Sequence, residues 1–135
     1  MTALVGPIYI AHPYTAPSAQ LRRFNVVLAA ELSTTVNRMG AATISPLQES
    51  SGREHALDEY GWLDHGLVLI RACRAAVVPM GFAQSSGCRA EYDEARKLRI
   101  PVFLAKRAHH GVNAPEWRIE HRFANWVRDE RARAH

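Results

Sequence analysis

The segment from residue 84 to residue 91, Gln-Ser-Ser-Gly-Cys-Arg-Ala-Glu, has the pattern of a ligand-binding turn that leads into a helix. Ser85 or Ser86 can cap such a helix, and Gly87 lets a ligand approach the backbone closely. A helix N-terminus also carries free N–H donors and a positive dipole. We therefore expect Ser85, Ser86 and Gly87 to bind a phosphate or a carboxylate.

Glu91 is the reactive group that this segment offers. A helix expected from Gly87 to Leu98 places it on the inward stripe, and burial there raises the pKa of a carboxylate while the helix N-terminus opposes that shift. A carboxylate on an inward face is uncommon unless it is paired or functional. Glu91 is thus either a reactive carboxylate or a structural one, bonded to an arginine or to loop backbone. The stripe consists of Cys88, Glu91, Tyr92, Ala95 and Leu98.

Chemistry at an anomeric carbon generally uses a second carboxylate. Asp64 is the first candidate because it shares a helical stripe with apolar residues, and Asp58 is the reserve. On spacing alone, Asp64 is equally consistent with a surface position. The stripe around it consists of Leu57, Tyr60, Leu67 and Val68.

Aromatic residues accompany the first strand. Tyr9 lies in mid-strand, and Tyr14 follows His12 and Pro13 at its mouth. We count His12, Pro13 and Tyr14 as substrate-binding candidates because ligands of such folds bind beyond the carboxyl ends of the strands. An aromatic ring at the mouth can stack on a base, or it can simply pack.

Short β-branched runs alternate with helical periodicity along the whole chain. Strands are expected at 7–11, 41–45, 75–79 and 100–105, and helices at 18–39, 53–72, 87–98 and 115–131, with Pro115 in the first turn of the last helix. This order predicts one doubly wound (flavodoxin- or Rossmann-like) α/β domain, with a mostly parallel sheet of four to five strands and helices on both faces. The ligand crevice then falls at 12–18, 45–52, 80–91 and 106–113.

Composition and motifs argue against several classes of function. The 135 residues are 47% hydrophobic and 22% charged, with a formal charge of +4, and the C-terminal basic residues are mixed with acidic ones. That mixture is typical of a solvated helix face rather than a nucleic-acid-binding stripe. No apolar run could span a bilayer and no signal peptide is recognisable, so we expect a cytoplasmic protein. Histidine spacing, the two core cysteines and the lack of a P-loop or dinucleotide motif predict neither metal nor cofactor.

Four segments carry a resemblance to a known family: Tyr9-Ile10-Ala11-His12-Pro13-Tyr14, Ser45-Pro46 after a long helix, Ser86-Gly87 with Glu91 and Ala95, and Ile100-Pro101-Val102. With an aspartate-bearing helix between them, they resemble the nucleoside 2-deoxyribosyltransferase superfamily, which includes 2'-deoxynucleoside 5'-phosphate N-hydrolases. The resemblance covers about residues 7 to 105 and is most specific from 75 to 102.

The resemblance implies cleavage of the N-glycosidic bond of a nucleoside or nucleotide. Glu91 would attack C1' of the sugar and form a glycosyl-enzyme, which water or a second base resolves. Asp64 would assist through sugar hydroxyls or by protonating the leaving base. Tyr9 matches a tyrosine near the nucleophile, and Ser86 with Gly87 matches the segment that binds the 5'-phosphate.

Two other functions stay open at this point: a binding or sensing module that keeps the fold without turnover, and a flavodoxin-like partner domain, which an inward Glu91 disfavours. We also expect a homodimer. On the final helix Trp117 and Trp126 would point to roughly opposite sides, which leaves one indole for a partner or for the loop at 109–114.

Overall fold

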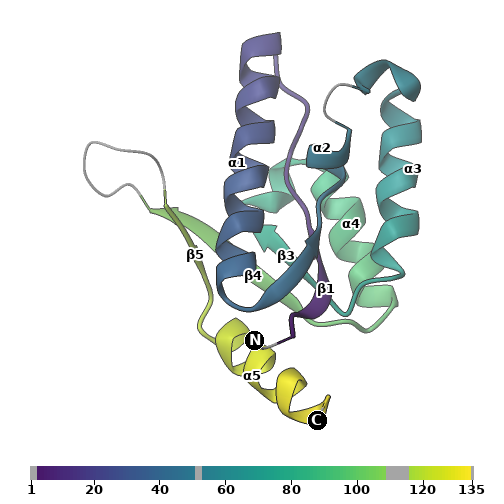
Figure 1. Ribbon diagram of the computed structural model, residues 1–135. Helices are drawn as coiled ribbons and strands as arrows, with labels where there is room; N and C mark the ends of the chain where they lie inside the picture. The colour runs from purple at the N-terminus through teal and green to yellow at the C-terminus, as the bar shows by residue number, and fades with distance from the viewer. Residues whose placement is uncertain (1–2, 51–52, 109–115, 135) are drawn as a thin grey trace.

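A computed structural model describes residues 3–50, 53–108 and 116–134. Its centre is a five-stranded sheet in the order β2-β1-β3-β4-β5 (Figure 1). The first four of these strands in space are parallel, and β5 runs antiparallel to β4. The strands are β1 (Val5–Ile10), β2 (Ala41–Ile44), β3 (Ala75–Pro79), β4 (Val102–Ala108) and β5 (Glu116–Ile119).

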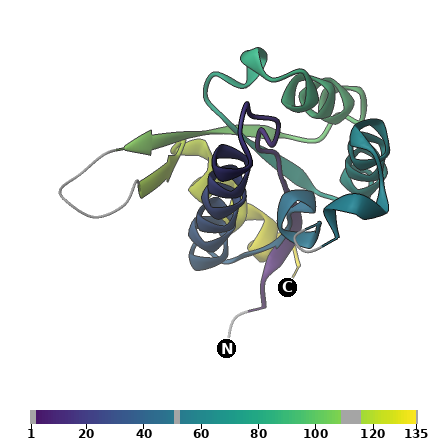
Figure 2. The ribbon, with the colours of Figure 1, turned by 90° about the horizontal axis from the view of Figure 1, so that it is seen from above.

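Helices cover both faces of this sheet, so the predicted α/β class with a mostly parallel sheet is confirmed. The sheet is strongly curled, like half a barrel (Figure 2), rather than the open twisted sheet that was expected. None of the described helices has the length and apolar character needed to cross a membrane. The helices are α1 (Ala19–Arg38), α2 (Pro46–Glu49), α3 (Glu59–Ile70), α4 (Ser86–Lys97) and α5 (Arg122–Arg133).

Alternation along β1 decides which side chains meet which helices. Ile8 and Ile10 pack with α1 and α5 in one apolar cluster, whereas Tyr9 belongs to a second cluster with residues of α3 and α4. Because β1 lies between β2 and β3, Tyr9 is fully buried. Its hydroxyl group therefore points into the layer formed by α3 and α4.

The prediction of a single final helix at 115–131 is wrong. Glu116–Ile119 instead form β5, and α5 begins only at Arg122. Trp117 and Ile119 alternate with exposed Arg118, which is the period of a strand rather than of a helix. The buried Trp117 also donates a hydrogen bond of 3.0 Å from Nε1 to the carbonyl oxygen of Leu28.

With Trp117 on β5, the two tryptophans no longer support the expected homodimer. Trp117 lies on β5 and is buried, while Trp126 lies on α5, partly buried against Phe103 and Phe123. The two indoles are on different elements, and neither is left bare for a partner. The loop at 109–114 and Pro115, which also entered that prediction, lie outside the described residues.

Other boundaries also differ from the sequence prediction, among them those of the strands at 5–10 and 102–108. The helix expected at 53–72 begins later, at Glu59, after a short 3-10 turn at 54–56. The crevice segment expected at 45–52 contains the short helix α2, whose first residue is Pro46. Proline suits that first position because it has no N–H to leave unpaired.

An ion-pair cluster attaches α5 to the amino-terminal end of the central strand β3. Glu130 is 8% exposed and accepts hydrogen bonds of 2.5 Å from both Arg74 and Arg133. Arg74 stands just before β3, so Glu130 joins the C-terminal helix to the central strands. Both bonds are charge-assisted, and their burial at the carboxylate keeps water from competing fully.

Glu130→Ala should lower the free energy of unfolding by about 1 to 2 kcal/mol, because two charge-assisted hydrogen bonds are lost while the arginines stay largely solvated. Asp129→Ala is the matched control, since Asp129 is exposed and its one ion pair among the described residues is with Arg128, at 3.6 Å. The control should stay within about 0.5 kcal/mol of the wild type. Urea unfolding of the three proteins measures both values, and equal losses would contradict the role of Glu130.

Candidate active site

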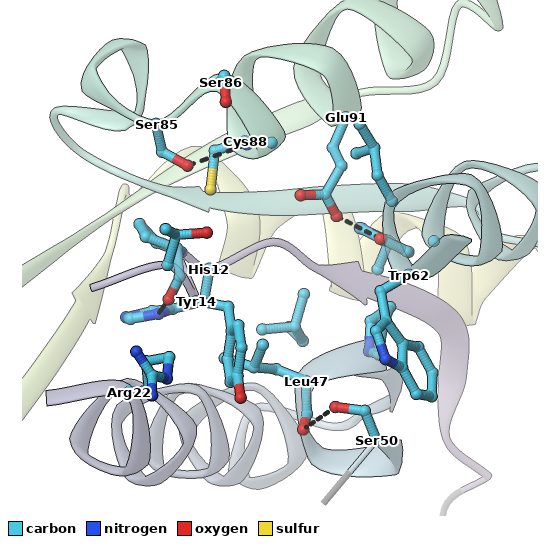
Figure 3. A pocket seen from close by; sticks show the side chains of 18 of the residues that line it. His12, Tyr14, Arg22, Leu47, Ser50, Trp62, Ser85, Ser86, Cys88 and Glu91 are labelled. Carbon is cyan, nitrogen blue, oxygen red and sulfur yellow. Dashed lines mark hydrogen bonds between the residues drawn. The ribbon is translucent and has the colours of Figure 1, made fainter. Parts of the chain in front are cut away.

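A cavity of about 960 Å³ lies at the carboxyl edge of the sheet, a volume suited to a small-molecule ligand. Its walls come from the loop after β1, from α2 and α3, and from the N-terminal half of α4. Figure 3 shows Glu91, Ser85 and Ser86 on one side of this cavity and Tyr14 and Arg22 on the other. The edge is the one that the sequence predicted for ligands.

The start of α4 brings Glu91 to the cavity. Gly81 adopts a left-handed conformation (φ 83°) after β3, and a 3-10 turn at 82–84 then leads to the helix. The Ser85 hydroxyl group accepts a 3.3 Å hydrogen bond from the Cys88 N–H, as predicted for a cap. Cys88 and Ala95 are buried as expected for the inward stripe, and Glu91 lies between them, one turn from Cys88.

Glu91 forms a hydrogen bond with Tyr9, 82 residues away in the chain. The Tyr9 hydroxyl group donates to the Oε2 atom of Glu91. The described residues offer no hydrogen-bond partner to the other oxygen, Oε1. One carboxylate oxygen is thus held by the protein core, while the second remains available to a molecule in the cavity.

Gly66 makes room for this pair. It is buried in α3, and a Cβ atom built on it would approach the Tyr9 hydroxyl oxygen more closely than real Cβ atoms do. The same Cβ would lie 3.7 Å from Oε2 of Glu91. A glycine in a helix interior costs about 0.5 to 1 kcal/mol relative to alanine, so its place here is explained by the approach of α3 to β1 and α4.

Burial raises the pKa of Glu91 from 4.5 to about 7, although the hydrogen bond from Tyr9 lowers it. The predicted opposition from the helix N-terminus is weak, because Glu91 lies beyond the first turn, where the dipole effect fades. Near neutral pH the carboxyl group therefore populates both protonation states. Such a value suits a group that gains and loses a bond or a proton during a reaction.

Tyr9 and Cys88 are held in their neutral forms. Burial raises the pKa of Tyr9 far above its ordinary value, and the neighbouring charge of Glu91 adds to that shift. Burial likewise raises the pKa of the Cys88 thiol to about 12. Tyr9 consequently acts as a fixed hydrogen-bond donor, and Cys88 is not a nucleophile at neutral pH.

His12 is a neutral imidazole at the rim of the cavity. Burial lowers its pKa, the hydrogen bond to Pro13 opposes this, and the charge of Arg107 lowers the pKa further. Its Nδ1 lies 2.9 Å from the Pro13 carbonyl oxygen, which can only accept, so Nδ1 carries the proton. The other nitrogen, Nε2, is therefore an acceptor.

The structure brings together most of the residues that the sequence singled out. Those that line the cavity are Tyr9, His12, Pro13, Tyr14, Ser85, Ser86, Gly87 and Glu91.

The two candidate partner carboxylates are elsewhere. Asp64 is exposed on α3 and does not line the cavity. Asp58 caps α3, accepting a 2.7 Å hydrogen bond from the Gly61 N–H. Glu91 is thus the only carboxylate among the described residues that line this cavity.

Leu47 and Ser50 lie in the crevice segment predicted at 45–52, whereas other lining residues were not recognised in the sequence: Arg22, Tyr60, Trp62 and Gly66. Arg22 is the only arginine or lysine among the described lining residues, and its Nη1 donates to the Ala16 carbonyl oxygen at 3.0 Å. Of these residues, only Gly66 could have been recognised from the sequence, because a glycine within an apolar helical stripe usually marks the close approach of another element to the helix.

The described residues contain no cluster of three or more histidine, cysteine or carboxylate side chains that could hold a metal ion. Comparison with known proteins adds no assignment: no family model matches the chain, and no curated protein matches its sequence. What the site can do chemically therefore follows from its own geometry.

Gly66→Ala should destabilise the protein by about 1 to 3 kcal/mol, because the new methyl group collides with the Tyr9 hydroxyl group. Gly87→Ala is the matched control, a helical glycine whose added Cβ has Ser85 Oγ as its nearest neighbour, at 4.0 Å. The control should be neutral or slightly stabilising. Thermal unfolding distinguishes the two, and equal stability would show that α3 is not packed tightly on the pair.

The raised pKa of Glu91 predicts a pH dependence of stability. Since the folded protein holds the Glu91 proton up to about pH 7 and the unfolded chain releases it near 4.5, the free energy of unfolding should fall as pH rises through that window. The loss is on the order of 3 kcal/mol relative to Glu91→Gln, which does not titrate. Urea unfolding between these pH values measures it, and a constant difference between the two proteins would contradict the raised pKa.

Proposed function

We propose that the protein cleaves the N-glycosidic bond of a nucleoside or nucleoside 5'-monophosphate, with Glu91 as nucleophile. The observation that carries the proposal is the Tyr9–Glu91 pair: one oxygen bound by a buried phenol, the other unpartnered among the described residues, at the wall of a cavity of about 960 Å³. The resemblance to nucleoside 2-deoxyribosyltransferases supports the same chemistry, and we propose membership of that superfamily.

In the first step, a lone pair on Oε1 of Glu91 forms a bond to C1' of the sugar. The bond from C1' to the base nitrogen breaks, and its electron pair leaves with the base. Tyr9 keeps Oε2 in place by donating its hydrogen bond, which also favours the ionised form of Glu91. Holding the nucleophile in one orientation lowers the entropy cost of reaching the transition state.

In the second step, water attacks C1' and the ester bond to Glu91 breaks, which returns the carboxylate. The proton that the water loses passes to the released base through solvent in the open cavity. One water is consumed overall, with its hydroxyl group on the sugar and its proton on the base.

Substrate recognition uses the two walls of the cavity. The backbone N–H groups at Ser86 and Gly87 begin α4 and offer donors for a 5'-phosphate, and Arg22 supplies positive charge across the cavity. Tyr14 and Trp62 provide aromatic surface for stacking on a base.

Asp64 has no role in this reaction. Its exposed position on α3 leaves the leaving base to be protonated by solvent. The strand order 2-1-3-4-5 supports a doubly wound, flavodoxin-like origin for the fold, in which ligands bind at the carboxyl edge. The curl and the antiparallel β5 are the departures from that arrangement.

A second candidate function is a nucleotide-binding or sensing module without turnover. The observation that favours it is the single carboxylate at the cavity among the described residues, where two-carboxylate glycosidases place a pair.

Release of free base from a panel of deoxynucleosides and their 5'-monophosphates separates the two functions. Glu91→Gln should lower the rate by about three orders of magnitude or more while leaving the fold intact. Glu94→Gln is the matched control: the same change on the same helix, at a residue paired with Arg71 outside the cavity. Asp64→Asn should remain within a few-fold of the wild type. Binding without any base release would establish the sensing module instead.

A further inference from the structure

A second cavity, of about 380 Å³, opens on the other side of the loop after β1. It lies between α1 and the carboxyl ends of β3 and β4, with Trp117 of β5 in its wall. His12 and Pro13 of this loop line both cavities, as does Gly81 after β3, so these residues lie between the two cavities. The reaction proposed for Glu91 makes no use of the second cavity.

The second cavity is positively charged. Lys106 and Arg107, consecutive residues of β4, both line it, and its described lining contains no carboxylate. Within the described residues neither side chain takes part in an ion pair. Arg118, opposite Lys106 in the β4–β5 ladder, adds a further positive charge to this region. Glu116 is the nearest acidic residue along that ladder, opposite Ala108, and it is exposed.

Arg107 is held in place without an acceptor for its buried N–H. Its Nε atom is closed off from solvent and lacks a hydrogen-bond partner in the described part of the chain. The guanidinium carbon lies 5.6 Å from the centre of the Phe24 ring, a cation–π contact that orients the group. A buried donor left unpaired is costly, by about 1 to 3 kcal/mol, so the Arg107 side chain is held at this position by its packing rather than by a protein acceptor.

We propose that the second cavity is a binding site for a phosphate-class anion, held by the Arg107 guanidinium group and the Lys106 ammonium group. The planar guanidinium group matches two phosphate oxygens at once, and lysine adds a mobile point charge. The phosphate belongs either to a nucleotide that reaches past His12 and Pro13 or to a free phosphate or pyrophosphate. The site does not depend on the chemistry at Glu91, and Glu91→Gln should retain it.

Isothermal titration calorimetry at low salt, with inorganic pyrophosphate in one arm and deoxyadenosine 5'-monophosphate in the other, tests the proposal. The double variant Lys106→Gln/Arg107→Gln should bind at least tenfold more weakly than the wild type. Lys97→Gln is the matched charge control, since Lys97 is exposed at the far end of α4 and lines neither cavity. Arg107→Lys, which keeps the charge, should retain more affinity than Arg107→Gln, and thermal unfolding checks that each variant is folded.

The two arms also identify the source of the phosphate. A loss confined to the nucleotide arm would place the nucleotide's phosphate in the second cavity rather than at Ser86 and Gly87, and a loss confined to the pyrophosphate arm supports a site for a free anion. Unchanged binding of both by the double variant, or no binding of either by the wild-type protein, overturns the proposal. Loss of base release in Glu91→Gln with anion binding retained would separate this site from the reaction.

Discussion

The hydrogen bond between Tyr9 and Glu91 is the contact on which the candidate site depends. It joins the central strand β1 to α4, two elements that are far apart in the chain, and it lies inside the apolar layer under α3. A phenol and a carboxyl group are costly to bury separately, and each satisfies the other here. The bond leaves one oxygen of Glu91 facing the cavity, and the absence of a side chain at Gly66 allows α3 to close over it. The close packing of α3 and the orientation of the Glu91 carboxyl group therefore have the same cause.

Burial and nearby charges set the protonation states of the titratable groups at the carboxyl edge of the sheet. Burial shifts the pKa of Glu91 up and that of His12 down, so a carboxyl group that titrates near neutrality stands in one cavity wall and a neutral imidazole at its rim. The charge of Arg107 acts on His12 from the second cavity. The loop after β1 thus carries residues that line both cavities. An anion bound in the second cavity would therefore change the electrostatic environment of His12.

Sequence reasoning was strongest where a pattern has a single physical cause. The Ser85 cap, the inward Glu91 and the alternation of strands and helices follow from local rules, and all three are present in the structure. It failed at Trp117 and Ile119, where two apolar residues fit a strand as well as a helix and only pairing with β4 decides between them. It also favoured Asp64, because a helical stripe does not show which part of its face reaches the sheet. Arg22 and Gly66 depend on contacts between distant elements, which spacing along one element does not reveal.

Trapping the covalent intermediate tests the central claim most directly. A nucleoside carrying fluorine at C2' slows both steps, because the substituent destabilises positive charge at C1', and the glycosyl-enzyme should accumulate when the base leaves readily. Mass spectrometry of the digested protein should then show the mass of the fluorinated sugar on the peptide that contains Glu91. Glu91→Gln should show no such adduct. A sugar attached to another residue, or free base released by the wild-type protein with no adduct at any time point, would contradict nucleophilic attack by Glu91.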